Sequence, residues 1–194
     1  MLVTAPSGIT PSPNVNGRGE SRVWQVVHVG RVRRAEGNVG RMAEPPLSPE
    51  ELDRVAATVE SWLKAQHDNP VVLAVERDES GAARWFVRLT SDEKGVFSIW
   101  LTLQQRTLHH ETYLMPAPIE NRAECYEQLL RRNLHLHGVQ LAIGGEDAVY
   151  LVGRDPADDL DDEVLDGVLG AHYAAVELCF RPAMRIGYAS LFQG

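Results

Sequence analysis

Apolar side chains recur at helical spacing in the first well-patterned stretch of this chain, residues 49 to 66. They follow steps of three and four that place them on one face of a helix: Leu52, Val55, Val59, Trp62 and Leu63. The sequence from Ser48 to Glu51 is a capping box with proline at the first helical position, so it predicts where the helix begins. Residues 68–70, Asp-Asn-Pro, predict its end.

Between Val71 and Met115 the apolar period changes to two, which is the period of a β-strand. Turn residues at 78–81, 91–95 and 104–106 divide this stretch into four strands of an antiparallel meander. One predicted face is strongly apolar, whereas the other is only half polar and includes side chains such as Trp85, Phe86, Val96 and Trp100. Either that second face is a partner surface, or a further helix or the N-terminal segment covers it.

A second helix, a hairpin and a third helix are predicted after Pro116 and Pro118. Asn121 predicts the start of the second helix, with Glu124 three residues on, and Gly138 predicts its end. Strands at 139–143 and 148–152 flank a tight turn, and apolar positions from 164 to 180 predict the third helix.

The third helix is followed by a proline and an apolar segment. Pro182 is expected to end or kink the helix. The segment at 184–192 is too apolar to remain in solvent, so it is expected to pack on its own domain or on another chain.

This order predicts an α+β fold, α-β-β-β-(β)-α-β-β-α, in which helices pack on an antiparallel sheet within a single domain at residues 43–194. Residues 1–42 are set apart, because the first twenty are rich in Pro, Gly, Ser and Asn and offer little to bury. Two interpretations stay open for them: a disordered tail containing a short strand at 23–29, or a mis-assigned leader ahead of a start codon at Met42.

Charge is divided unevenly along the chain. Residues 1–42 carry a net charge of +4, and the remaining 152 residues carry thirteen basic and twenty-five acidic side chains, a net charge of −12. An acidic body repels phosphate, which disfavours nucleic acid as its partner, although the basic residues 31–41 leave a minor nucleic-acid hypothesis for the tail. The chain has neither a membrane-length apolar run nor a secretory signal pattern, so a cytoplasmic protein without a membrane partner is expected.

Few residues suggest chemistry. His109 and Glu111 share a strand face, which is the basis of one alternative function, a metal-dependent hydrolase, but alternation of this kind is also typical of a solvated strand. His172 is interpreted as a half-buried packing residue, and Asn133, polar on an apolar stripe, as a buried hydrogen-bonding residue that fixes the next turn. Neither a calcium-loop frame nor a phosphate-binding or nucleophile motif occurs, so no cofactor, metal or catalytic residue is predicted.

Four segments give the chain a resemblance to a known family. They are PEELDRVAATVESWL, YEQLLRRNLHL with its L-x-x-x-N, GVQLAIGGEDAVYLVGR and LDDEVLDGVLGAHYA. Over residues 47–180 the chain resembles the YbjN family of bacterial proteins, associated with sensory transduction and placed in the type III secretion chaperone-like fold. The resemblance implies a non-enzymatic, protein-binding regulator or chaperone-like adaptor, often a homodimer, with an unknown protein partner.

The half-polar sheet face, the second helix, the hairpin and the apolar C-terminal segment together supply the predicted partner surface. Its candidate residues are Trp85, Trp100, Leu130, Tyr150, Met184, Ile186 and Phe192.

Overall fold

The computed structural model describes residues 46–79 and 81–192, all within the unit that spans residues 43–194. The predictions for residues 1–42, including the short strand and the basic segment, lie outside the described residues. The fold is therefore given for the second unit by itself.

Helix α1 (Pro49–Ala65) begins at the predicted capping box. The Glu51 N–H donates to the Ser48 hydroxyl, and the Ser48 N–H donates to the Glu51 carboxylate at 2.8 Å. Val59, Trp62 and Leu63 are buried, as the apolar spacing predicts. A short 3-10 turn, η1 (Gln66–Asp68), follows the helix and leads into the sheet.

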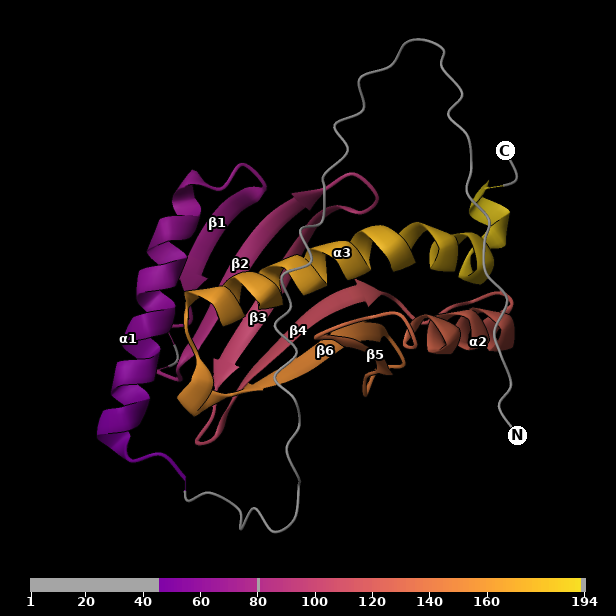
Figure 1. The fold of residues 1–194 in the computed structure, drawn as a ribbon. Coiled ribbons are helices and arrows are strands. Elements are labelled where there is room, and N and C mark those ends of the chain that lie inside the picture. Colours follow the sequence, from indigo (N-terminus) through magenta and orange to yellow (C-terminus); the bar gives the residue numbers. More distant parts are fainter. Residues whose placement is uncertain (1–45, 80, 193–194) are drawn as a thin grey trace, which may run out of the picture. The chain divides into compact units, whose positions relative to one another are not determined.

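The sheet has six strands, and all of its pairings are antiparallel. In spatial order they are β1 (Val72–Arg77), β2 (Arg84–Ser91), β3 (Gly95–Leu103), β4 (Thr107–Met115), β6 (Val149–Pro156) and β5 (Gln140–Ile143). The first four form the predicted meander, and the hairpin of β5 and β6 joins it through β4 (Figure 1). The α+β fold class and the element order are confirmed.

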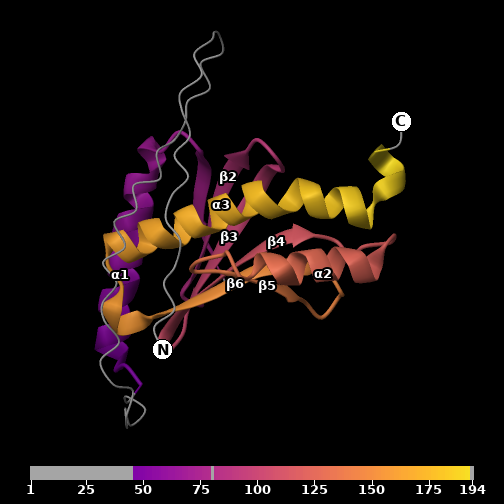
Figure 2. The same ribbon diagram turned by 45° about the vertical axis from the view of Figure 1, so that its right-hand side comes forward.

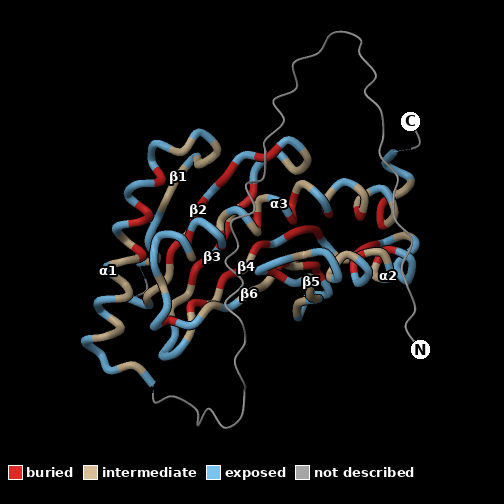
Figure 3. Tube along the Cα trace, in the orientation of Figure 1, coloured by how far each residue is buried: buried red, intermediate tan, exposed pale blue. Residues whose placement is uncertain are grey.

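One face of the sheet builds the core. Alternate side chains of the strands are buried there beneath the helices α1, α2 (Arg122–Arg132) and α3 (Asp162–Gly187). Figures 1 and 2 show α3 crossing the face of the sheet at an angle to the strands, with α2 beside its C-terminal half. On the second face, Val96, Trp100 and Tyr113 stay exposed, and Figure 3 shows buried and exposed positions along the strands.

Pro182 does not end the third helix, which continues for five more residues to Gly187. Proline removes one hydrogen bond of the helix interior, at a cost of about 3 kcal/mol. Ala183 and Gly187 lie beyond it and are fully or almost fully buried, and the Cys125 thiol contacts the Ala183 carbonyl oxygen. Packing on the sheet and on α2 therefore keeps the chain helical past the proline.

The ends of α2 also differ from the prediction. Asn121 has a positive φ of 44° and makes no side-chain capping bond; its amide donates instead to the carbonyl of Ile186 at 3.2 Å. The helix ends at Arg132 rather than near Gly138. Gly138 has a φ of +73°, so it serves a turn that lies well after the helix.

Asn133 has the structural role that its position on the apolar stripe predicts. Its side-chain oxygen accepts from the backbone N–H of Leu141 at 2.8 Å, and its amide group donates back to the Leu141 carbonyl at 3.4 Å. These two bonds hold the end of α2 against β5, and thereby fix the loop between them.

Candidate protein-binding surface

An apolar groove lies between α2 and β5. It encloses about 240 Å³, and its lining is almost entirely apolar: Tyr126, Leu129, Leu130, Leu141, Ala142, Ile143 and Val149. Leu130 is 67% exposed and Ile143 is 54% exposed. Neighbouring elements thus present large apolar side chains to solvent on both sides of one groove, which is a common property of protein-binding surfaces.

The sequence of α2 explains why this groove is open. Cys125 and Leu129 face the core, while Tyr126 and Leu130 are each one position further around the helix and face β5. β5 has only four residues and is the edge strand of the sheet. A short edge strand cannot cover the broad apolar face of α2, so Leu130 remains outside the core.

The second face of the sheet carries two aromatic pairs. Phe86 and Trp100 meet edge to face with ring centroids 4.3 Å apart, and Tyr113 and Tyr150 meet in the same way at 5.5 Å. Trp100 is 39% exposed. A shallow cavity of about 210 Å³ lies over the first pair, with Glu76 and Arg88 among its polar lining. This face is therefore mixed in polarity rather than continuously apolar.

The C-terminal segment packs on its own domain up to Tyr188 and Ser190. The Tyr188 hydroxyl donates to the Ala117 carbonyl at 2.6 Å, and the Ser190 N–H donates to the Glu120 carboxylate at 3.0 Å. Leu191 and Phe192, in the last turn η3 (Ala189–Phe192), are 70% and 49% exposed. Of the two interpretations, packing on the same chain is thus observed for most of the segment.

Trp85 was predicted for the partner surface, and this prediction is wrong. Side chains two residues apart on a strand point to the same face, so Trp85 shares a face with Val87 and Leu89. This face is covered by the helices, and all three residues are at most 1% exposed. Met184 and Ile186 also pack partly against the core. The exposed candidates are Trp100, Leu130 and Phe192, while Tyr150 is half-buried and donates a hydrogen bond to Glu146.

The two residues of the hydrolase hypothesis, His109 and Glu111, do share the second face of β4. They lie opposite Thr102 and Trp100 on β3, and opposite Arg154 and Val152 on β6. Within residues 46–79 and 81–192 no group of three His, Cys, Asp or Glu side chains is placed to hold a metal ion.

Sequence reasoning missed a buried polar network that links β4, β6 and α3. The His110 Nδ1 lies 2.7 Å from the Nε2 of His172, and the His110 Nε2 lies 3.0 Å from an Asp155 carboxylate oxygen. Both rings are fully buried, and burial lowers the pKa of His172 to about 3. His172 is thus more deeply buried than predicted, and no sequence signal paired two histidines 62 residues apart.

Proton positions in this network follow from the chemistry of its ends. An ionised Asp155 accepts from Nε2–H of His110, so Nδ1 of His110 accepts from Nε2–H of a neutral His172. The Nδ1 of His172 is then an unprotonated acceptor, and it has no partner in the structure. Burial keeps the His172 ring neutral, because it lowers the pKa of that ring to about 3.

Comparison with known proteins gives relatives over part of the chain. An uncharacterized protein of Mycobacterium tuberculosis is 30% identical over 107 residues, and one of Mycobacterium leprae is 30% identical over 113 residues. These matches cover 55% and 58% of this chain and 58% and 61% of the relatives, so the chain spans about three fifths of the curated relatives' length. No family model matches, and membership of the YbjN family stays a prediction.

Two solved complexes contain chains that are similar to this one over part of its length. The HopA1–SchA chaperone–effector complex matches at 14% identity, over 71% of this chain and 99% of that chain, with a TM-score of 0.47. The ExsC–ExsE complex matches at 19% identity, over 65% and 93%, with a TM-score of 0.48. Among the described residues, no helix has the length and apolar character needed to cross a membrane.

Proposed function

We propose that the protein is a non-enzymatic adaptor that binds another polypeptide in the groove between α2 and β5. The observation that carries this proposal is the pair of exposed side chains, Leu130 and Ile143, that face one groove from two neighbouring elements. Fully burying such a side chain contributes roughly 1.5–3 kcal/mol, so these two residues alone offer a substantial part of a binding free energy.

The occupant that fits this groove is an apolar segment of a partner protein. A volume of about 240 Å³ accommodates one or two large apolar side chains rather than a whole helix. The groove has little polar surface, so side-chain shape and apolar area decide which segment binds. A second copy of this chain is the other occupant that the experiment below distinguishes.

The test replaces Leu130 with Asp, alone and together with Ile143→Asp, in the full chain. Leu178→Asp is a matched control, because Leu178 is an exposed leucine on α3 that does not line the groove. We expect the Leu130 variants to lose a purified partner at least tenfold in affinity by calorimetry, and the control to bind normally. Partner candidates come from affinity capture and crosslinking with the wild-type chain.

Two further measurements complete the test. Sedimentation of the wild-type chain alone shows whether the occupant is a second copy, in which case the Leu130→Asp chain becomes monomeric. Thermal unfolding of Leu130→Asp should match the wild type, since the side chain is largely exposed. Loss of folding in that variant, or unchanged affinity of a folded variant, would contradict the proposal.

A further inference from the structure

Strand β6 is longer than its neighbour β5. Residues 149–152 of β6 pair with β5, whereas residues 153–156 pair only with β4, at Thr107–His110. The second half of β6 therefore has a strand on one side and none on the other within the described part of the chain (Figure 1). A strand edge of this kind is a template for an added strand.

Crowding at Gly153 explains why β5 begins only at Gln140. A Cβ atom at this position would lie 2.5 Å from the Gly138 carbonyl oxygen and 2.1 Å from the His110 ring. Gly153 has the same parity as the buried Leu151, so its missing side chain faces the helices. The chain before β5 thus crosses over Gly153 on the helix side instead of continuing along the edge of β6.

The hydrogen-bond pattern of the hairpin shows which groups lie on this edge. The Gly144 N–H donates to the Ala148 carbonyl at 2.8 Å, which makes this a hydrogen-bonded pair. Such pairs alternate in an antiparallel ladder, so Tyr150, Val152 and Arg154 direct their backbone groups toward the β5 side. Val152 is opposite Gln140, but Arg154 has no opposite residue. Its backbone N–H and C=O are thus open to a partner.

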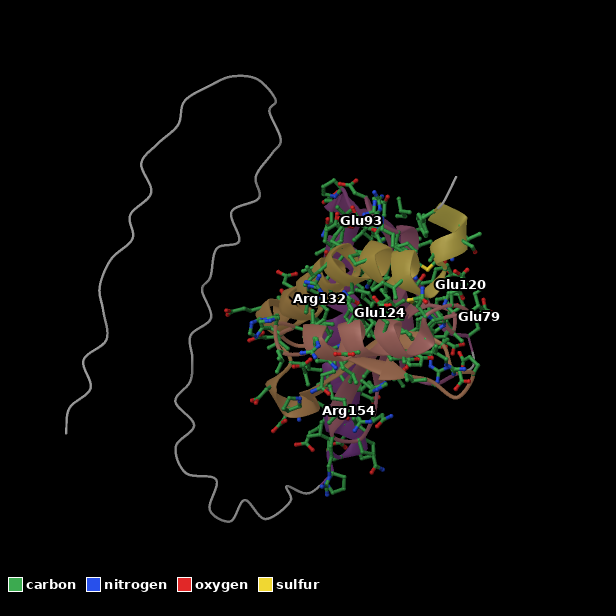
Figure 4. The ribbon with its side chains drawn as sticks, turned by 90° about the vertical axis from the view of Figure 1, so that its right-hand side faces the viewer. Glu79, Glu93, Glu120, Glu124, Arg132 and Arg154 are labelled. Carbon is green, nitrogen blue, oxygen red and sulfur yellow. The ribbon has the colours of Figure 1, made fainter. Side chains whose placement is uncertain are left out.

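A pocket of about 700 Å³ opens beside this edge. It is lined by His109, Asn133, Leu136, Gly138, Val139, Gln140, Val152, Gly153 and Arg154. No carboxylate is among these residues, although the surrounding body carries a net charge of −12. Arg154 is exposed and, among the described residues, forms no salt bridge. Figure 4 shows Arg154 well apart from Glu93, Glu120 and Glu124.

Arg154 is the permanently charged side chain among the residues that line the pocket. Burial lowers the pKa of His109, so its ring is mainly neutral at pH 7 and contributes a polar nitrogen rather than a charge. The walls formed by Leu136, Val139 and Val152 are apolar. One fixed positive charge, an open backbone pair and an apolar wall thus lie together at one place on the sheet.

We propose that this edge binds an extended peptide segment in which a carboxylate side chain is flanked by apolar residues. The segment adds to β6 as a strand: its backbone exchanges two hydrogen bonds with Arg154, its carboxylate pairs with the Arg154 guanidinium, and an apolar neighbour enters the pocket. The site is separate from the α2–β5 groove and does not rest on it. Pro156 lacks an N–H, which limits the added strand to a few residues.

The test uses three five-residue probes with the full chain. The first is acetyl-Thr-Val-Glu-Val-Thr-amide, and the other two carry Gln or Lys in place of the central Glu. Binding is followed by chemical shifts of the isotope-labelled protein. We expect saturable binding of the Glu probe, with at least tenfold weaker binding of the Gln and Lys probes, and slower amide exchange at Arg154 when the Glu probe is bound.

Variants separate the side chain from the backbone contribution. Arg154→Met should weaken binding of the Glu probe about tenfold and leave binding of the Gln probe unchanged. The control is Arg185→Met, at an exposed arginine on α3, which should change the binding of neither probe. Leu130→Asp should bind the Glu probe normally, which distinguishes this site from the groove. Amide exchange in the wild-type chain needs no variant, so it remains decisive if Arg154→Met fails to fold.

Several results would overturn the proposal. These are equal affinity for the Glu and Gln probes, absence of binding up to about 5 mM, or binding that leaves the Arg154 amide unprotected. Protection of that amide without any peptide, increasing with protein concentration, would show that a second copy of the chain occupies the edge instead.

Discussion

At the scale of single residues, the absence of a side chain at Gly153 decides much of the local structure. The His110 ring and the Gly138 carbonyl both occupy the space in which a Cβ would lie. One glycine thereby leaves room for the buried histidine pair and sets the point at which β5 begins. Nothing in the sequence distinguishes Gly153 from the other glycines of the hairpin.

Gly153→Ala is expected to destabilise the protein. The new Cβ would lie 2.1 Å from His110 Cε1, so the ring or the strand must move, and overpacking of this kind costs roughly 1–3 kcal/mol. Gly170→Ala is the matched control, since nothing lies within 4 Å of its added Cβ and alanine favours the helix by up to about 1 kcal/mol. Urea unfolding measures both; equal stability of Gly153→Ala and the wild type would contradict the packing.

At the scale of elements, the histidine network joins β4, β6 and α3, and it makes their association depend on pH. Burial lowers the pKa of His172 to about 3, below its ordinary value of 6.5. Between pH 6.5 and about pH 3, His172 therefore binds a proton in the unfolded chain but not in the folded chain. The free energy of unfolding falls as the pH is lowered through this range.

The free energy of unfolding should be about 2 kcal/mol lower at pH 5 than at pH 8, because the pKa of His172 is lowered. His172→Phe removes the titrating ring and should flatten this slope, whatever its stability at pH 8. His135→Gln, at an exposed histidine, should retain the wild-type slope. Equal slopes in the wild type and His172→Phe, measured by denaturant titration between pH 5 and 8, would show that another group is responsible.

The proline of α3 gives a second test at this scale. Pro182 leaves the Leu178 carbonyl, four residues earlier, without its helical hydrogen bond, although the helix continues on both sides. Pro182→Ala restores a donor and is expected to raise the melting temperature by several degrees, since 1 kcal/mol corresponds to about 2–4 °C in a chain of this size. A lower melting temperature would mean that the proline ring itself packs tightly.

At the scale of the whole molecule, the α2–β5 groove and the exposed Trp100 belong to different sides of the sheet. Leu130 and Ile143 flank the groove beside α2, whereas Trp100 lies on the second face. If the groove is the binding surface, the environment of Trp100 should not change when a partner binds.

Acrylamide quenching of tryptophan fluorescence tests this independence. Trp100 is 39% exposed, whereas Trp62 and Trp85 are at most 4% exposed, so Trp100→Phe should remove most of the quenching that comes from this unit. A partner bound in the α2–β5 groove is expected to leave the Trp100 component unchanged. Strong protection of Trp100 would place the contact on the second face of the sheet instead.

The sequence by itself determined the elements and their order, because local rules govern them. The capping box at Ser48, the period of two from Val71 to Met115 and the bonds of Asn133 each depend on residues close in the chain. The fold class followed from that order. The groove was anticipated only in part, through Leu130 on the stripe of α2.

Only the tertiary structure decided which apolar residues are exposed and which polar residues meet. Trp85 and Trp100 both belong to the patterned strands, yet their opposite parity and the position of the helices bury one and expose the other. His110 and His172 are 62 residues apart, and the open edge at Arg154 exists because Gly138 crosses Gly153. Long-range packing sets these features, and the local preferences of the chain do not specify it.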